Sequence, residues 1–174
     1  MTMNQQPDAL SQARAQVTSE MRDFFDALYD GADTGDLGAA DLALIAEQAR
    51  AVMLQGAPQL VLSDAPRFSL VIALNDDRPF LFDSAVAAAI AGGAVIRNVF
   101  HPILGQGGKK FSLLVFVIEP APDADLRARL IANLEECFAA GAAAVRDWHA
   151  MLARLRAARA ELAARPPYDP QRGG

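Results

Sequence analysis

Three carboxylates close together, Asp76, Asp77 and Asp83, are the first side chains in this chain that could do chemistry. Paired carboxylates can act as general acid and base, or they can hold a metal ion. Asp76 and Asp77, however, adjoin the expected start of a helix, where side-chain capping and the helix dipole account for them. Asp83 falls in the expected first turn of that helix, where the helix dipole also stabilises its negative charge. We therefore expect a structural role for all three.

The chain contains two histidines, His101 and His149, and one cysteine, Cys137. The histidines belong to different elements, and no Cys–His or His-Glu-x-x-His spacing accompanies them, so we expect no metal site. Pro102 follows His101 and indicates an edge or a strand end, which favours a structural histidine there. Two glutamates precede Cys137, and their charge raises the pKa of the thiol. Cys137 is therefore expected to be a small core residue.

The glycine-rich segment Gly105–Lys110 invites comparison with a phosphate-binding loop. A Walker loop requires a glycine five positions before Gly108, where this chain has Ile103. It also requires serine or threonine after Lys109, where this chain has Lys110. The segment is expected to join two strands, so it lacks the helix dipole that holds phosphate. No G-x-G-x-x-G pattern follows a strand either, and we expect no cofactor, NAD included, to bind this chain.

Two helices are expected before residue 58. Apolar residues recur at helical steps from Asp8 onward and predict one helix that ends near Gly31. Asp41 is expected to cap a second helix, which Gly56 and Pro58 end. The predicted buried positions of the two helices are Leu10, Val17, Met21, Phe24 and Leu28, then Leu42, Ile45, Ala49 and Met53.

The middle of the chain predicts strands around one helix. Pro79 suits the first turn of that helix, and the pair Gly92-Gly93 ends it. The expected strands are Gln59–Ser63, Arg67–Leu74, Ala94–Leu104 and Phe111–Ile118. The order β–α–β–β–α, with a short strand before it, predicts an α+β fold. We expect an ACT-like or ferredoxin-like, mainly antiparallel sheet with helices packed on one face, together with N-terminal helices and a long C-terminal helix.

The strand Phe111–Ile118 is apolar on both of its faces. Such a strand is either central and covered on both sides, or it uses one face to contact a partner. After Pro122 the chain is expected to be helical to about Ala164. Apolar residues there form a narrow coiled-coil-like seam at Val145, Trp148, Leu152, Leu155 and Leu162. Trp148 is interpreted as a packing residue, within the chain or against a partner.

Composition narrows the class of protein. Apolar residues make up 52% and charged residues 21% of the 174 residues, a globular balance. The net charge of −5 argues against nucleic acid and against an anionic membrane surface as partners. No signal peptide and no membrane-spanning run is visible, so a cytoplasmic location is expected. We divide the chain into a helical extension (1–57), an ACT-like domain with the long helix (58–164) and a tail or linker (165–174).

Three separate blocks of sequence resemble one family. The segment NDDRPFLFDS (Asn75–Ser84) is similar to the signature NDD-M-PFLVDS near the start of the large bacterial NAD-specific glutamate dehydrogenases. VFHPIL (Val99–Leu104) resembles that family's V-x-HP-hydrophobic strand, and VRDWHAM (Val145–Met151) its V-x-DW-x-x-M run. The blocks keep their order and spacing over roughly residues 60–165. Departures are Arg78 in place of methionine, Phe82 in place of valine, and a shorter hairpin turn without the Arg-Arg-Asp stretch.

The resemblance implies a non-catalytic N-terminal ACT-like module. The parent enzyme would convert L-glutamate and NAD to 2-oxoglutarate and ammonia, and NAD would bind elsewhere in that parent. The chain would be an excised piece or a free-standing relative. Its expected partners are other domains or subunits of the parent, or a second copy of itself, through an exposed sheet face or the seam.

An alternative is an ACT-like module that senses an amino acid. The resemblance to ACT modules implies that the ligand would bind at the strand–helix turn, where a glycine usually lets it approach the backbone amides. In this chain Phe80 occupies that position, and its bulk argues against the usual mode of binding. The residues considered for an effector site or an interface are Asn75, Asp76, Asp77, Arg78, Pro79, Phe80 and Trp148. No nucleophile, base and orienting group occur at workable spacing, so catalytic residues are not expected.

Overall fold

The computed structural model describes residues 8–164, apart from the side chains of Gln106, His149 and Ala164. The predicted tail, 165–174, lies outside the described residues. The chain divides within its last helix, between Cys137 and Phe138, into two compact units. The helices are α1 (Ala9–Gln16), the 3-10 turn η1 (Ser19–Met21), α2 (Arg22–Leu28), α3 (Ala39–Gln55), α4 (Leu81–Ala91) and α5 (Ala124–Ala164). The strands are β1 (Gln59–Asp64), β2 (Ser69–Asp76), β3 (Ile96–Phe100), β4 (Ile103–Gln106) and β5 (Lys109–Ile118).

The strands form one antiparallel sheet in the order β1-β2-β5-β3. Strand β4 pairs with the first part of β5, and β3 pairs with its second part. Strands β2 and β3 are connected through α4, and β5 lies between them, as in a split β–α–β unit. The edge position beside β2 is filled by β1, which precedes the unit in sequence. The predicted α+β class with a long C-terminal helix is confirmed.

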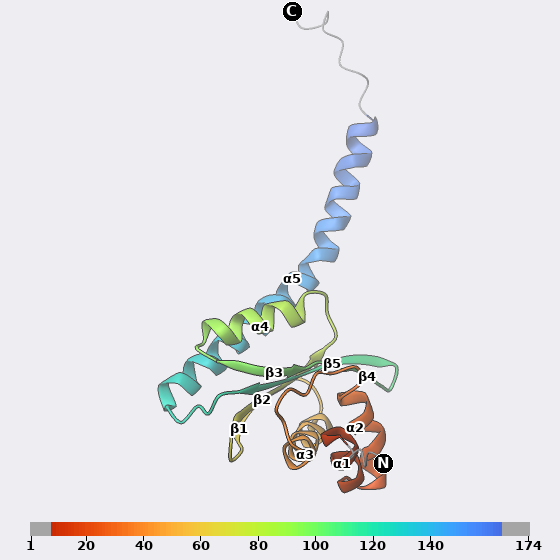
Figure 1. The fold of residues 1–174 in the computed structure, drawn as a ribbon. Helices are drawn as coiled ribbons and strands as arrows, with labels where there is room; N and C mark the ends of the chain where they lie inside the picture. Colours follow the sequence, from red (N-terminus) through yellow and green to blue (C-terminus); the bar gives the residue numbers. More distant parts are fainter. Residues whose placement is uncertain (1–7, 165–174) are drawn as a thin grey trace, which may run out of the picture. The chain divides into compact units, whose positions relative to one another are not determined.

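The two faces of the sheet are covered by different helices (Figure 1). One face packs on α1, α2 and α3, and its buried residues are Phe68, just before β2, and the strand residues Leu70, Ile72, Leu74, Phe100, Leu113, Val115 and Val117. The alternation of β-strands turns the remaining residues of β2 and β5 to the other face, which α4 and the first part of α5 cover. The ferredoxin-like helices thus occupy one face, and the N-terminal helices take the opposite one.

Strand β5 is covered on both sides. All residues from Ser112 to Ile118 are buried. Of the two alternatives for an all-apolar strand, the structure has the central, doubly covered one. The expectation that an open sheet face contacts a partner is wrong for this strand, because α1–α3 supply the missing cover.

The prediction of one continuous helix from Asp8 to about Gly31 is wrong, since this segment forms α1 and α2 with a break between them. Val17 and Thr18 are both extended, with ψ of 151° and 159°. Side chains branched at Cβ favour this backbone, and the break lets both helices reach α3. Two hydrogen bonds of 2.6 and 2.7 Å from Arg14 to Asp26 join α1 to α2. The predicted apolar positions are nevertheless buried or half-buried.

The predicted strand Ala94–Leu104 is also divided. It forms β3 and β4, separated at His101 and Pro102, because proline has no backbone N–H for the ladder. The carbonyl of Pro102 still accepts a hydrogen bond from Leu113 N at 3.1 Å. The strand end inferred from Pro102 is therefore confirmed.

Glycine allows two of the turns that the sequence predicted. Gly107 and Gly108 have φ of 58° and 80°, the two positive values that a tight hairpin turn requires, and this turn joins β4 to β5. Gly56, with φ of 82°, ends α3 as expected. Asp41, by contrast, is not the N-cap of α3: Gly38 is, and the Asp41 carboxylate accepts from Gly38 N at 3.0 Å.

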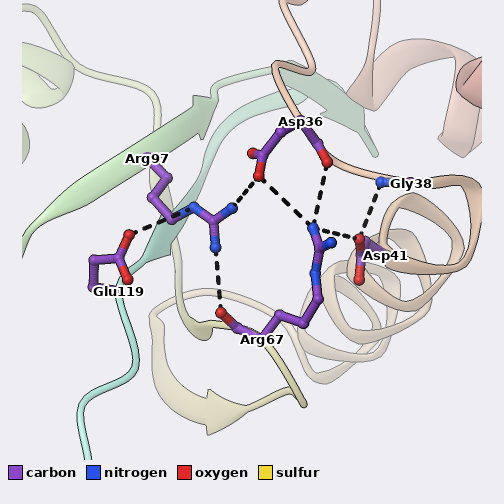
Figure 2. A network of polar contacts seen from close by, with 6 residues as sticks. All are labelled: Asp36, Gly38, Asp41, Arg67, Arg97 and Glu119. Carbon is purple, nitrogen blue, oxygen red and sulfur yellow. Dashed lines mark hydrogen bonds and ion pairs between the residues drawn. The ribbon is translucent and has the colours of Figure 1, made fainter.

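A polar network holds the loop before α3 against the sheet (Figure 2). Arg97 of β3 donates to Asp36 at 2.6 Å and to the carbonyl of Arg67 at 3.2 Å. Arg67 in turn lies 3.2 Å from Asp41. Glu119, after β5, lies 3.7 Å from Arg97 on the other side. The network ties the N-terminal helices to the edge of the sheet.

Candidate functional site

The turn from β2 into α4 contains most of the residues singled out in the sequence. Helix α4 begins at Leu81, two residues after Pro79, so Pro79 does not lie in the first turn as predicted. The N-cap is Phe80, which has φ of 63° and is the one described non-glycine residue with positive φ. A bulky residue in this left-handed conformation is unusual and prevents the helix from starting earlier.

The aspartates at this turn do not cap the helix. No side chain makes a hydrogen bond at the N-cap of α4, so the capping role predicted for Asp76 or Asp77 is wrong. Asp76 ends β2, is exposed, and lies 3.6 Å from Arg78. The backbone N–H of Asp77 donates to the carbonyl of Lys110 at 3.0 Å and so continues the β2–β5 ladder. Asp83 does lie in the first turn.

Two backbone amides at the start of α4 have no acceptor. Leu81 N donates to the carbonyl of Arg78 at 3.4 Å, and Ser84 N to that of Phe80 at 3.1 Å. Within residues 8–164, no acceptor is found for the N–H groups of the two residues between them, Phe82 and Asp83. Open N–H groups at a helix start, with the positive end of the dipole behind them, attract anionic groups.

Asn75 is a buried amide whose nitrogen has no partner. The residue is 5% exposed, and its Nδ2 makes no hydrogen bond. Its neighbour across the ladder is Ser112. Strand alternation places both on the face that α4 covers, at the end of β2 from which the chain enters α4. A buried donor without an acceptor costs about 1–3 kcal/mol, so this amide is available to any acceptor that reaches it.

His101 completes the polar cluster. Its Nε2 lies 2.5 Å from Ser112 Oγ, and its ring stacks on Phe82 with centroids 4.9 Å apart. Burial lowers the pKa of His101, and the charge of Asp77 opposes that shift. His101 thus has the hydrogen-bond partner that its structural interpretation predicted. Ser112 was missed in the sequence, although a lone serine in the apolar run FSLLVFVI was a visible signal.

The cluster offers hydrogen-bond donors rather than a nucleophile. Ser112 is fully buried, so its hydroxyl does not reach a substrate on the surface. The two open N–H groups suit a small acceptor such as a carboxylate, which would meet the buried Asn75 amide only on displacing what covers it. The side chain of Phe80 is 80% exposed, so the ring that was expected to hinder a ligand projects into solvent.

Two of the residues considered in the sequence lie on α5: Cys137 at the end of the first unit, and Trp148 in the second unit. Trp148 is 53% exposed, so it is not part of the core. Cys137 is partly buried rather than a core residue, and burial, not the charge of the neighbouring glutamates, raises the pKa of its thiol. The side chain of His149 lies outside the described residues.

Comparisons with known proteins and the general features of the fold add three findings. No protein-family model and no curated protein matches this chain. No three His, Cys, Asp or Glu side chains in the described part of the chain gather where a metal ion could be held. Of the helices between residues 8 and 164, none is both long and apolar enough to cross a bilayer.

Proposed function

We propose that this chain is a protein–protein assembly module, and the observation that supports it is the apolar surface of α5. Five large apolar side chains are exposed along one stretch of this helix; four are seam residues, Val145, Trp148, Leu155 and Leu162, and the fifth, Met151, adjoins the half-buried seam residue Leu152. Single exposed apolar residues are ordinary, but a run at steps of three, four and seven on one helix is typical of a helix–helix contact.

The sheet is less suited to this role. The central strands β2 and β5 are covered on both faces by helices of the same chain. Among the parts of the chain that the structure describes, the seam on α5 is therefore the apolar surface best suited to a partner.

The proposed parent protein is supported by sequence resemblance. The blocks at Asn75–Ser84, Val99–Leu104 and Val145–Met151 support an N-terminal regulatory or assembly domain of a cytoplasmic NAD-specific glutamate dehydrogenase. In that proposal the parent oxidises L-glutamate to 2-oxoglutarate and ammonia with NAD. This chain contributes neither catalytic nor cofactor-binding residues; it contacts other domains or subunits.

The test has two steps. The coding sequence around this chain is read first, and a reading frame that lacks a dehydrogenase domain would overturn the parent assignment. If the domain is present, the full-length enzyme is compared with one that lacks residues 1–174. We expect the deletion to alter the oligomeric mass and the glutamate dependence of NAD reduction. An unchanged mass together with unchanged glutamate saturation would sink the assembly role.

A second candidate, amino acid sensing, is favoured by the unpartnered Nδ2 of Asn75 near the start of α4. An amino acid carboxylate would accept from this amide and from the open N–H groups of Phe82 and Asp83. Calorimetry with an amino acid series at millimolar concentration tests it, with Asn75→Leu as the control. Heat that disappears in the variant supports sensing, and no heat with any amino acid refutes it.

A further inference from the structure

The seam on α5 follows a heptad pattern with one charged position. Between Val145 and Leu162 its positions are, in order, Val145, Trp148, Leu152, Leu155, Arg159 and Leu162. Their steps of three and four are those of alternating a and d positions in a coiled coil. Arg159 is exposed and, among the described residues, forms no ion pair. A charge in a coiled-coil seam is a device that sets register and partner.

Resting on the proposed assembly function, we propose that the occupant of this seam is a second copy of the chain, paired antiparallel about a two-fold axis between Ala153 and Arg154. The order of the seam positions reads the same in spacing from either end. Pairing each a position with a d position therefore matches Val145 with Leu162 of the second copy, Leu152 with Leu155, and Trp148 with Arg159. Two-fold symmetry then repeats every contact, as in a closed dimer.

The charge of Arg159 decides between the two orientations. In a parallel pair in register, Arg159 would face Arg159 in the seam, and like charges there repel. In the antiparallel pair each Arg159 lies against the indole of Trp148, a favourable cation–π contact that occurs twice. Antiparallel helices also place opposite ends of their dipoles together. Every seam position in this arrangement has a compatible partner.

The charges flanking the seam identify the main competing occupant. Within residues 145–162 the charged residues are Arg146, Arg154, Arg156, Arg159, Asp147 and Glu161, an excess of positive charge. A different helix bound to this seam would accordingly be acidic. Such a partner could form an ion pair with Arg159, but the two contacts between Trp148 and Arg159 that self-pairing provides would then be absent. The experiment below separates the two.

The first measurement is the mass of the whole chain against concentration, by sedimentation equilibrium with Trp148 fluorescence followed in parallel. Trp148 is the single tryptophan, so the loss of water around it on pairing shifts its emission. We expect a monomer–dimer equilibrium. Arg159→Glu should weaken the dimer by about tenfold or more, since two cation–π contacts are lost. Arg154→Glu, the matched control outside the seam, should change the dissociation constant by less than about twofold.

Cysteine cross-linking tests the orientation. In a Cys137→Ser background, reduced chains carrying Leu152→Cys and reduced chains carrying Leu155→Cys are oxidised each alone and as an equimolar mixture. Antiparallel pairing predicts a disulfide-linked dimer chiefly in the mixture, because residue 152 faces residue 155 of the other copy. Parallel pairing predicts linked dimers of each variant alone. That second pattern would overturn the proposed geometry.

The outcomes also separate this inference from the assembly function. A chain that stays monomeric at all concentrations, with Trp148 emission unchanged on dilution, overturns self-pairing. The same result in a full-length enzyme whose assembly still depends on residues 1–174 would leave the assembly function standing with an acidic helix as the occupant. Self-pairing that persists in Arg159→Glu would show that the seam is not the contact, and would also refute the inference.

Discussion

Arg97 in β3 and Asp36 in the loop before α3 are 61 residues apart in sequence, and Arg97 Nη2 donates to Asp36 Oδ2 over 2.6 Å. The side chain of Arg97 is largely buried by its surroundings, whereas that of Asp36 is mostly exposed. The pair connects the N-terminal helices to the far edge of the sheet (Figure 2). Loss of this contact would therefore indicate that the N-terminal helices have separated from the sheet.

Acid should release this contact. The hydrogen bond from Arg97 lowers the pKa of Asp36 below its ordinary value of 3.8. A depressed carboxyl pKa contributes stability that is present above the unfolded pKa and is lost as pH falls through the folded one. At about pH 7 the urea midpoint of unfolding should thus be higher for wild type than for Asp36→Asn. At about pH 3 this difference should be smaller. A difference that does not depend on pH would contradict the role of the charge.

Gly92 should not tolerate a side chain, because the first part of α5 approaches it closely. A Cβ on Gly92 would lie 2.8 Å from the Cα of Leu130, a backbone atom that cannot move alone. We expect Gly92→Ala to lower the free energy of unfolding by about 1–3 kcal/mol, the usual range for overpacking. Thermal or urea unfolding followed by circular dichroism measures this.

Gly141 provides the control for that change. It lies inside α5, and nothing lies within 4 Å of an added Cβ. Alanine is favoured over glycine in a helix by about 1 kcal/mol, so Gly141→Ala should raise helix stability by about that amount. If both substitutions destabilised the protein equally, the close approach of α5 to Gly92 would not be the cause.

Asn75 should be replaceable by an apolar residue of similar shape. Its unpartnered Nδ2 is desolvated without compensation. We expect Asn75→Leu to raise the free energy of unfolding by about 1 kcal/mol, because the cost of that desolvation disappears. Asn75→Asp should be destabilising, since it buries a charge in the same place. Equal losses for both variants would show that the amide has a partner in solution.

His101 should make the fold sensitive to mild acid. Burial lowers its pKa from 6.5, so the unfolded chain binds the proton more readily than the folded one. Stability is then fully present above pH 6.5 and is lost as pH falls from there through the folded pKa. Unfolding curves between about pH 7.5 and pH 5 should show this slope in wild type and a smaller one in His101→Gln. An identical slope in both would exclude His101 as the titrating group.

Local sequence patterns were enough to predict the kinds of elements and their apolar faces. Alternation in β2, the seam steps in α5 and the glycine pair at Gly107-Gly108 each depend on neighbours a few residues away, so the pattern was visible in the chain. These local signals sufficed for the α+β class, the hairpin turn and the strand end at Pro102. They also marked the segment around Asn75, which lies in the polar cluster with Ser112 and His101.

Tertiary structure decided what depends on contacts between distant segments. The covering of the second sheet face by α1–α3 and the placing of Ser112 next to both Asn75 and His101 have no local signature. Apolar residues keep their helical spacing across the bend at Val17 and Thr18, so the two β-branched residues were too weak a signal to predict it without the packing on α3. A short-range pattern states which face is apolar, whereas the three-dimensional arrangement decides what covers that face.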